Sequence, residues 1–437
     1  MPAIRGLTRF GNLLHLAIDP SGFIGRAFDR GDVVRARVGA DWSLLLRQPE
    51  LIEQVLVTRN RSFMKDRITR SLSDLVGNGL LVSEGEFWRR QRRLAQPAFH
   101  RERIAAYAGG MVEAARRAAA SWREGQVDLH ALLMRLTRDV VATTLFPGSA
   151  AREADEVGES LEVLMARFAD WRHAVWPGLA NLPLADNRRY EAARARMHDV
   201  VDRIIAERRR VGSPDHGDLL GMLMAARDED GTQMSDEQLR AEVLILYVAG
   251  HETTALALSW AFVLLSQRPG TWALLAREVD EVLGKRDATA EDAPRLQYTE
   301  RVILETMRLY PPAWSIGREA LEDVDLDGLA IERGTQVWIV QWASHRDPRF
   351  FPRPQAFLPE RWDNDLLRRL PRFAYFPFGG GPRLCIGNNF AMLEAVLVLA
   401  TLVQRWRPTI APRDVPRPQF SITLRPNGPL RAQLHPR

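Results

Sequence analysis

The chain is poor in cysteine and lysine. Of its 437 residues only one is cysteine, Cys385, and only two are lysine, Lys65 and Lys285. A single thiol excludes an internal disulfide and a cysteine-ligated iron–sulfur cluster, and it suits a reducing compartment. The formal net charge of +5 therefore comes almost entirely from arginine. Because no nucleic-acid recognition motif and no basic tail accompany this charge, we expect an acidic protein partner rather than nucleic acid.

Long apolar runs and flexible linkers are missing as well. Residues 1–20 lack the charged-then-apolar pattern of a signal peptide, and their best apolar run, 13–18, is too short to span a bilayer. No Ser/Gly-rich stretch or break in composition divides the chain. We therefore expect one domain over residues 1–437, monomeric and cytoplasmic, with no membrane span and no fused reductase domain.

The cysteine lies in an unusual stretch, residues 378–387, which reads F-G-G-G-P-R-L-C-I-G. The consecutive glycines allow the backbone to approach a bulky group closely. An apolar helical run begins just past Cys385, and a helix N-terminus favours the thiolate that an iron ligand needs. The alternative is a buried structural cysteine, the commoner role of a lone thiol. A phosphate loop is excluded, because no Gly-Lys-Ser/Thr follows the glycines.

The whole stretch resembles the haem-binding loop of the cytochrome P450 family, F-x-x-G-x-R-x-C-x-G. It is matched by Phe378, Gly381, Arg383, Cys385 and Gly387. In that family the cysteine is the axial ligand of the haem b iron, the aromatic side chain packs beside the sulfur, and the arginine binds a haem propionate. The resemblance carries these roles to Cys385, Phe378 and Arg383, and it places Gly387 at the cofactor.

The longest predicted helix begins at Ser235 and runs to about Ser266, and its middle, residues 249–254, reads A-G-H-E-T-T. A glycine inside a helix costs about 1 kcal/mol relative to alanine, and a buried acid is costly unless it is paired. Two such features in one apolar helix indicate a site. The alternative is a helix-packing glycine beside a satisfied polar patch. The zinc-protease motif H-E-x-x-H is excluded, because residue 255 is alanine.

The same resemblance identifies this segment as the family's A-G-x-E-T motif. It implies that the Thr253 hydroxyl acts on bound O2 and that Glu252 helps to relay protons. It also implies that Gly250 leaves room for oxygen at the helix surface and that Ala249 lines the substrate pocket.

Further cofactor and pocket residues follow from two other segments. Trp88 and Arg92 lie four apart on a predicted helix, and so on one face; in the family this W-x-x-x-R pair donates to a haem propionate. In the segment P-P-A-W-S-I-G-R-E, which begins at residue 311, the resemblance assigns Arg318 to haem and Trp314 and Ile316 to the pocket.

An E-x-x-R pair, Glu305 and Arg308, has a structural role in the family. With Arg361 farther along the chain, it resembles a buried network that holds the cysteine loop in position. Trp362 stands where the family usually has phenylalanine.

Three predictions concern local structure. Residues 33–38 and 43–47 are expected to form a hairpin. Residues 170–186, rich in Trp, Pro and Leu, are expected to be either a loop packed on its own domain or, as the family resemblance implies, a mobile lid over an apolar channel. Residues 420–425 and 430–434 are expected to pair through an Asn-Gly turn.

The resemblance covers nearly the whole chain and implies a mainly α fold with small β-sheets (α+β). This is the triangular prism of cytochrome P450, with a long central helix crossing over the haem. The implied activity is that of a haem-thiolate monooxygenase, which inserts one atom of O2 into a C–H bond by hydroxylation or epoxidation. A peroxygenase or isomerase on the same fold, or a non-catalytic haem protein, are the alternatives.

Electrons must come from elsewhere, because the chain has no flavin-binding segment. The resemblance implies a separate ferredoxin or flavodoxin with its reductase, fed by NAD(P)H. Arg89, Arg90 and Arg93 are a candidate docking patch for its acidic surface, with plain solvated arginines as the equal alternative. The substrate is expected to be a lipophilic small molecule, such as a fatty acid, terpenoid, steroid or polyketide. Residues 311–318 resemble fatty-acid hydroxylases most.

Overall fold

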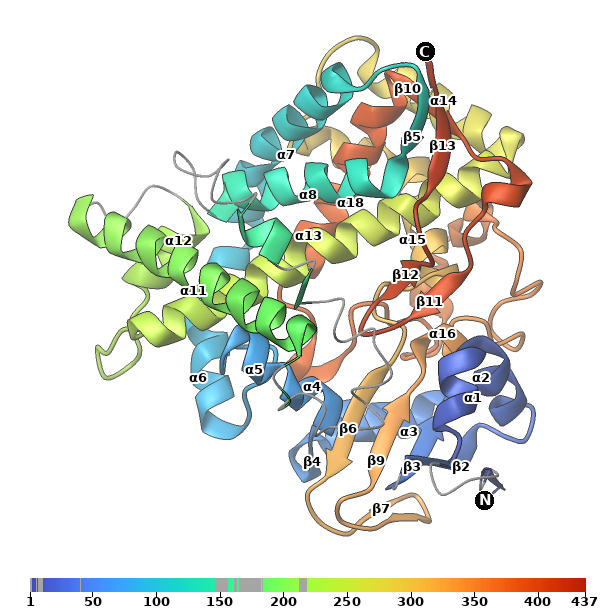
Figure 1. Ribbon diagram of the computed structural model, residues 1–437. Coiled ribbons are helices and arrows are strands. Elements are labelled where there is room, and N and C mark those ends of the chain that lie inside the picture. The colour runs from blue at the N-terminus through green and yellow to red at the C-terminus, as the bar shows by residue number, and fades with distance from the viewer. Residues whose placement is uncertain are drawn as a thin grey trace.

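Helices dominate the chain, and short strands gather in small sheets (Figure 1). The computed structural model describes residues 2–4, 6, 11–39, 41–145, 156–160, 163–164, 182, 184–211 and 218–437. The longer helices are α2 (Pro20–Phe28), α6 (Gly85–Ala95), α7 (Arg101–Ser121), α8 (Leu129–Leu145), α11 (Ala185–Val211), α13 (Asp236–Ser266), α14 (Pro269–Leu283), α15 (Gln297–Leu309) and α18 (Asn388–Val403). The shorter ones are α1 (Leu13–Ile18), α3 (Pro49–Glu53), α4 (Arg67–Ser71), α5 (Ser73–Val76), α12 (Leu219–Ala225), α16 (Gln341–Ser344) and α17 (Leu366–Arg369).

The strands lie mostly in the part of the molecule that holds the N-terminus (Figure 1). They are β1 (Ala3–Ile4), β2 (Val33–Val38), β3 (Asp41–Leu46), β4 (Phe63–Lys65), β5 (Gly125–Asp128), β6 (Ile316–Ala320), β7 (Val324–Leu326), β8 (Leu329–Ile331), β9 (Gln336–Ile339), β10 (Trp406–Thr409), β11 (Pro418–Phe420), β12 (Leu424–Pro426) and β13 (Arg431–Pro436). The main sheet has the order β1-β2-β3-β9-β6-β4, so strands from the N-terminal part of the chain pair with strands from residues 316–339.

The long helix α13 forms the centre of the helical part, where it packs against α8, α11, α15 and α18 (Figure 1). A capping box starts it: the Ser235 side chain accepts from the Gln238 N–H, and the Gln238 side chain accepts from the Ser235 N–H. Its length and apolar composition would allow it to cross a membrane, but 72% of its apolar 18-residue window is buried inside the protein. A helix that is apolar on all sides and surrounded by other helices is a core helix.

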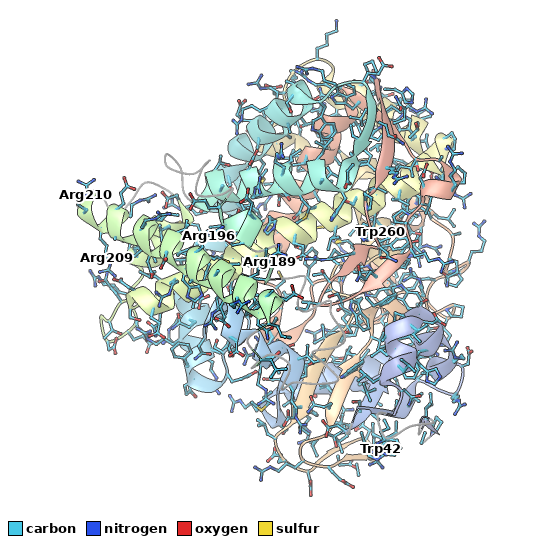
Figure 2. All side chains as sticks on the ribbon, in the orientation of Figure 1. Trp42, Arg189, Arg196, Arg209, Arg210 and Trp260 are labelled. Atoms are coloured by element: carbon cyan, nitrogen blue, oxygen red, sulfur yellow. The ribbon has the colours of Figure 1, made fainter. Side chains whose placement is uncertain are left out.

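Part of the arginine charge lies along the helix α11. Figure 2 shows Arg189, Arg196, Arg209 and Arg210 along α11, whereas Trp260 lies in the interior of the molecule. Trp260 is fully buried, and its indole N–H donates to the Leu424 carbonyl oxygen at 2.9 Å.

The hairpin predicted for the C-terminal segment is wrong. β12 pairs antiparallel with β11, whereas β13 pairs with β10 and β5. A tight turn, in which the Ser421 N–H donates to the Thr423 carbonyl oxygen, closes the first hairpin inside the predicted strand. Asn427 and Gly428 therefore connect two different sheets.

The other local predictions have different outcomes. β2 and β3 form the expected hairpin, but β3 begins at Asp41, two residues earlier than predicted. The predicted lid over 170–186 lies almost entirely outside the described residues.

Candidate active site

One internal cavity brings together most of the predicted site residues. Its volume is about 420 Å³, which is typical of a small-molecule site. Its walls come from β4, α6, α8, α13, the segment after α15, β6 and the loop that carries the cysteine. The predicted site residues that line it are Trp88, Arg92, Ala249, Gly250, Thr253, Ile316, Arg318, Phe378, Arg383, Cys385 and Gly387.

The cysteine loop is closed by backbone contacts directly before α18. The Cys385 N–H donates to the Phe378 carbonyl oxygen at 3.0 Å. Gly381 has a φ of +67°, and a Cβ there would lie 1.9 Å from the Leu56 carbonyl oxygen. Only glycine fits this position, because any side chain would collide with the backbone of the neighbouring segment.

The thiol of Cys385 lies at the wall of the cavity, at the N-terminus of α18. Burial raises the pKa of this thiol. The N–H of Gly387, which donates to the sulfur, and the positive charge of Arg92 oppose that rise. The Gly387 N–H in the loop and Arg92 on α6 therefore supply a donor and a charge that favour a thiolate at this sulfur.

Four cationic side chains line the cavity, and no carboxylate does among the described residues. Lys65 on β4 stands directly opposite Arg318 on β6 in the antiparallel register. Like charges in this arrangement destabilise a sheet. Within the part of the chain that the structure describes, no ion pair is formed by Lys65, Arg318 or Arg92, whereas Arg383 pairs with Glu84. A ligand with carboxylates at this end would offset these charges, so the residues fit haem with its propionates.

Burial affects these cations as expected for groups that face a ligand site. It lowers the pKa of Arg318 and of Arg92, and it lowers the pKa of Arg383 to about 10. Lys65 was not predicted as a site residue, because its place opposite Arg318 depends on strand register that the sequence does not display.

The helix α6 supports the cysteine loop through the predicted W-x-x-x-R pair. The guanidinium carbon of Arg383 lies 3.8 Å from the centre of a Trp88 ring, a cation–π contact. The Arg92 side chain donates to the Leu384 carbonyl oxygen at 2.9 Å. Both contacts connect α6 to residues next to Cys385.

The acid and the alcohol on α13 face different surroundings. Thr253 lines the cavity, and its hydroxyl donates to the Ala249 carbonyl oxygen at 2.8 Å. Glu252 is buried and is not part of the lining. Its carboxylate accepts from the Arg425 guanidinium at 2.7 Å and from the Thr423 hydroxyl at 2.5 Å. The acid is therefore held by the β11–β12 hairpin, behind the cavity wall.

Gly250 lets two helices approach closely. A Cβ at this position would lie 3.0 Å from Cγ2 of Val141 on α8. The missing side chain is thus explained by helix packing, although the residue also lines the cavity. Room for oxygen at this position stays a prediction.

A buried acid that the sequence analysis missed contacts the cavity wall. Thr254, which lines the cavity, donates to Oε2 of Glu394 at 3.0 Å. Glu394 is fully buried on α18, and its other oxygen, Oε1, has no partner among the described residues. Burial raises the pKa of Glu394 to about 8.

This acid should make the stability of the protein depend on pH. The folded pKa of about 8 lies above the ordinary value of 4.5, so the folded state binds the proton more tightly. The destabilisation is absent below the ordinary pKa, grows as pH rises through this interval and is complete above the folded pKa. We expect Glu394→Gln to be more stable than wild type by about 4 kcal/mol at pH 8, and by only about 1 kcal/mol at pH 5. Urea denaturation at both pH values measures this, with Glu281→Gln as an exposed control; equal differences at both pH values would disprove it.

The assignment of Trp314 to the substrate pocket is wrong. Trp314 is buried outside the cavity, where its indole N–H donates to the Ser421 carbonyl oxygen at 2.6 Å and its ring meets Phe420 edge-on. Its neighbours Ala313 and Ser315 line the cavity instead. The hydrogen bond to Ser421 and the contact with Phe420 hold the indole away from the cavity, whereas the prediction chose Trp314 for its large apolar side chain.

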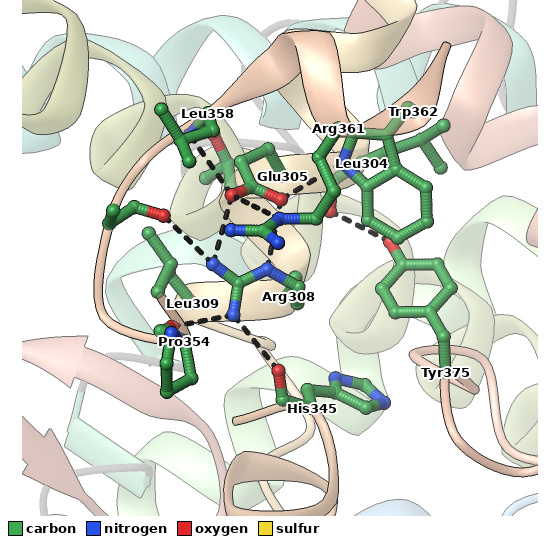
Figure 3. Close-up of polar contacts among 12 residues, drawn as sticks. Leu304, Glu305, Arg308, Leu309, His345, Pro354, Leu358, Arg361, Trp362 and Tyr375 are labelled. Atoms are coloured by element: carbon green, nitrogen blue, oxygen red, sulfur yellow. Dashed lines mark hydrogen bonds and ion pairs between the residues drawn. The ribbon is translucent and has the colours of Figure 1, made fainter. Parts of the chain in front are cut away.

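The structure brings Glu305, Arg308 and Arg361 together in a fully satisfied buried network (Figure 3). Arg308 makes two hydrogen bonds of 2.9 Å to the Glu305 carboxylate and also donates to the carbonyl oxygens of His345 and Pro354. The remaining donors to Glu305 are the side chain of Arg361, the backbone N–H of Leu358 and the indole N–H of Trp362.

Trp362 is the residue that differs from the family pattern, and its indole explains how it fits. The indole N–H donates to Oε2 of Glu305 at 3.0 Å, a contact that phenylalanine cannot make.

A second structural clamp lies next to the cysteine loop. Nε2 of the buried His345 accepts from the Phe376 N–H at 2.9 Å, and the Gln341 side chain donates to the Phe376 carbonyl oxygen at 2.6 Å. Burial lowers the pKa of His345 to about 3, so its ring is neutral and can accept this bond. His345 is therefore structural.

Comparison with known proteins agrees with this site. The family model described as Cytochrome P450 matches residues 1–433. The chain is 40% identical to cyclooctatin synthase of Streptomyces melanosporofaciens, over 99% of this chain and 95% of the relative. It is 39% identical to cyclooctat-9-en-7-ol 5-monooxygenase of the same organism, over 91% and 87% of the two chains. It is 35% identical to pentalenene oxygenase of Streptomyces avermitilis, over 95% and 92%.

Solved structures give the same result. The retinoic acid-bound cyanobacterial CYP120A1 superposes with a TM-score of 0.88 at 27% identity, covering 100% of this chain and 98% of the other. The haem domain of cytochrome P450DA gives 0.90 at 28% identity with the same coverage. The predicted fold class, enzyme class and haem cofactor are thereby confirmed. The chain belongs to the cytochrome P450 family and is a haem-thiolate monooxygenase that uses O2 and electrons derived from NAD(P)H through a redox partner.

Proposed function

We propose that this monooxygenase hydroxylates a neutral cyclic terpenoid. The names of two relatives, cyclooctat-9-en-7-ol 5-monooxygenase and pentalenene oxygenase, refer to a cyclic alcohol and a cyclic olefin. The observation that supports the proposal is the division of the cavity wall into an apolar part and a cationic part.

The apolar part is contributed by α8, α12, α13 and the segment before α6. Its described lining residues are Leu80, Leu81, Val141, Thr144, Leu219, Ile245, Leu246, Ala249, Gly250, Thr253, Thr254 and Ala257. None of these carries a charge, and threonine hydroxyls supply the polar contacts. The cations lie instead on β4, β6, α6 and the cysteine loop, where haem propionates would use them. A fatty acid would bury its carboxylate among apolar groups without a partner, which is costly. Although residues 311–318 resemble fatty-acid hydroxylases, we therefore propose a neutral substrate in place of a fatty acid.

The proposed roles of the site residues follow from their places in the cavity. Cys385 would hold the haem iron, and Arg318, Arg383, Trp88 and Arg92 would hold its carboxylates. When bound, haem supplies the activation of O2 and the electron transfer that insertion into a C–H bond needs. Phe378 and Gly387 would pack against it beside the sulfur.

The proposed proton carriers are Thr253 and Glu252. The Thr253 hydroxyl donates its hydrogen bond to the Ala249 carbonyl oxygen, so its lone pairs are free to accept a hydrogen bond in the cavity. A proton supplied by Glu252 must come from the side where Thr423 and Arg425 hold the carboxylate. The β11–β12 hairpin is thus part of the proposed route.

The redox partner is proposed to be a ferredoxin or flavodoxin with its own reductase. A surface groove beside the cysteine loop, lined by Arg89, Arg92, Arg93, Gln96, His100 and Pro382 among others, is the proposed docking site. It contains two arginines of the docking patch expected from sequence, although all three arginines of that patch are paired within the chain. Arg90 and Arg93 pair with Asp228, and Arg89 pairs with Glu86. A single monomeric cytoplasmic domain stays a prediction.

The substrate class is tested by ligand titrations of the haem absorption spectrum. The panel contains a cyclic terpene hydrocarbon, its alcohol, a fatty acid of equal carbon number and the methyl ester of that acid. We expect the cyclic compounds to bind more tightly than the fatty acid, and the ester to bind more tightly than the acid. Turnover with a surrogate ferredoxin and reductase under ¹⁸O₂ should place one labelled oxygen in the product. A fatty acid that binds more tightly than its ester would contradict the proposal.

A further inference from the structure

The segment 77–83, between α5 and α6, forms part of the cavity wall and lies directly against α13. Leu80 and Leu81 line the cavity beside Ile245 of α13. A Cβ at Gly79 would lie 2.7 Å from Cδ1 of Ile245 and 3.1 Å from the carbonyl oxygen of Ala241. Backbone therefore packs against helix here, and a small shift of the segment would change the shape of the cavity.

A buried acid on α13 holds this segment from one side. Glu242 is 1% exposed, and its Oε2 accepts from the Leu80 N–H at 3.1 Å. Its Oε1 has no hydrogen-bond partner among the described residues. Burial raises the pKa of Glu242 to about 7, and the Leu80 N–H and the charge of Lys65 oppose that rise. A buried carboxyl group with so few partners is costly to retain, so its contact with Leu80 calls for an explanation.

A buried cation on β4 holds the same segment from the other side. Lys65 is 7% exposed, and its ammonium group donates to the Leu80 carbonyl oxygen at 3.1 Å and to the Leu81 carbonyl oxygen. Its own backbone N–H donates to Glu84 at 2.8 Å, which fixes β4 to the start of α6. The Leu80 N–H thus donates to Glu242. The carbonyl oxygens of Leu80 and Leu81 accept from Lys65.

We infer that Glu242 and Lys65 are positioning residues that clamp the Leu80–Leu81 segment between α13 and β4 and thereby set the shape of the substrate cavity. The inference rests on the proposed function only in that the cavity binds the substrate; it does not depend on the class of substrate. A clamp with a merely structural role would lower stability without distinguishing large ligands from small ones.

The test compares two azoles that bind haem iron in the holoenzyme, imidazole and the larger 4-phenylimidazole. In Glu242→Leu, the Kd of 4-phenylimidazole should rise about tenfold, the ratio that corresponds to the loss of one hydrogen bond to a charged group. The Kd of imidazole, which is too small to need an ordered wall, should stay within about twofold on the same reasoning. Glu242→Gln should bind both azoles like wild type, because its amide oxygen still accepts from Leu80. Glu237→Leu, at an exposed acid on the same helix, is the matched control.

Hydrogen exchange of the protein supplies a readout that does not depend on ligands. Amides of residues 80–82 should exchange faster in Glu242→Leu than in wild type, and those of α6 should not. If Glu242→Leu does not fold, Lys65→Met tests the other half of the clamp. This variant should fold, because it removes the like charge opposite Arg318. It should give the same rise for 4-phenylimidazole. Equal changes for both azoles, or no change in either variant, would overturn the inference, whatever the outcome of the substrate panel.

Discussion

A Cys385→Ser variant should fold and lose its monooxygenase turnover down to the background rate. The hydroxyl is close in size to the thiol, and the backbone contacts that close the loop, from Cys385 to Phe378 and at Gly381, do not involve the side chain. What the variant loses is the sulfur anion, whose electron donation to haem iron favours cleavage of the O–O bond. No other cysteine exists in the chain to replace it.

The measurements for this variant are turnover, haem content and the midpoint of thermal unfolding. Turnover should vanish even in the fraction that carries haem, and the unfolding midpoint of the haem-free protein should match that of haem-free wild type. An Asn389→Ala variant, at an exposed residue just past the same loop, controls for disturbance of the backbone. Retained turnover in haem-loaded Cys385→Ser would show that the sulfur is not the iron ligand.

The largest loss of stability is expected from Glu305→Leu. Glu305 and Arg308 are both fully buried, and removing the acid leaves the guanidinium in the interior without its anion. Breaking a buried pair in this way costs about 3–5 kcal/mol, because the remaining charge is uncompensated. Arg361 and the indole N–H of Trp362 lose the same partner. Since the network lies beside the segment that leads to the cysteine loop, haem content should fall as well.

Urea denaturation of Glu305→Leu measures this loss. Glu300→Leu, at an exposed acid on the same helix, is the matched control and should change stability by less than about 0.5 kcal/mol. Trp362→Phe restores the family's usual residue and removes a single donor, so it should cost only about 1–2 kcal/mol. A Glu305→Leu variant as stable as Glu300→Leu would show that the network does not support the fold.

What the sequence reveals about this site is what lies close together along the chain. The stretch 378–387 and the helix segment 249–254 could be read directly, because each carries its chemistry within ten residues. Contacts between distant residues could not be read in this way. Lys65 meets Arg318 through strand register, and Thr254 meets Glu394 through the packing of α13 against α18. Neither of these two contacts can be predicted from the sequence.

The wrong predictions also concern contacts between residues that are distant in the sequence. Trp314 looked like a pocket residue because it is large and apolar, but contacts with the distant residues Ser421 and Phe420 hold its indole outside the cavity. The Asn-Gly pair at 427–428 has the composition of a hairpin turn. However, the turn at Ser421–Thr423 pairs β12 with β11, and β13 lies in another sheet.

The ligation of haem by Cys385 is tested most directly by the absorption spectrum of the wild-type protein after reduction and exposure to carbon monoxide. A thiolate-bound iron should give the strongly red-shifted Soret band that distinguishes cytochromes P450 from other haem proteins. A protein without haem, or a Soret band typical of histidine-ligated globins, would contradict it.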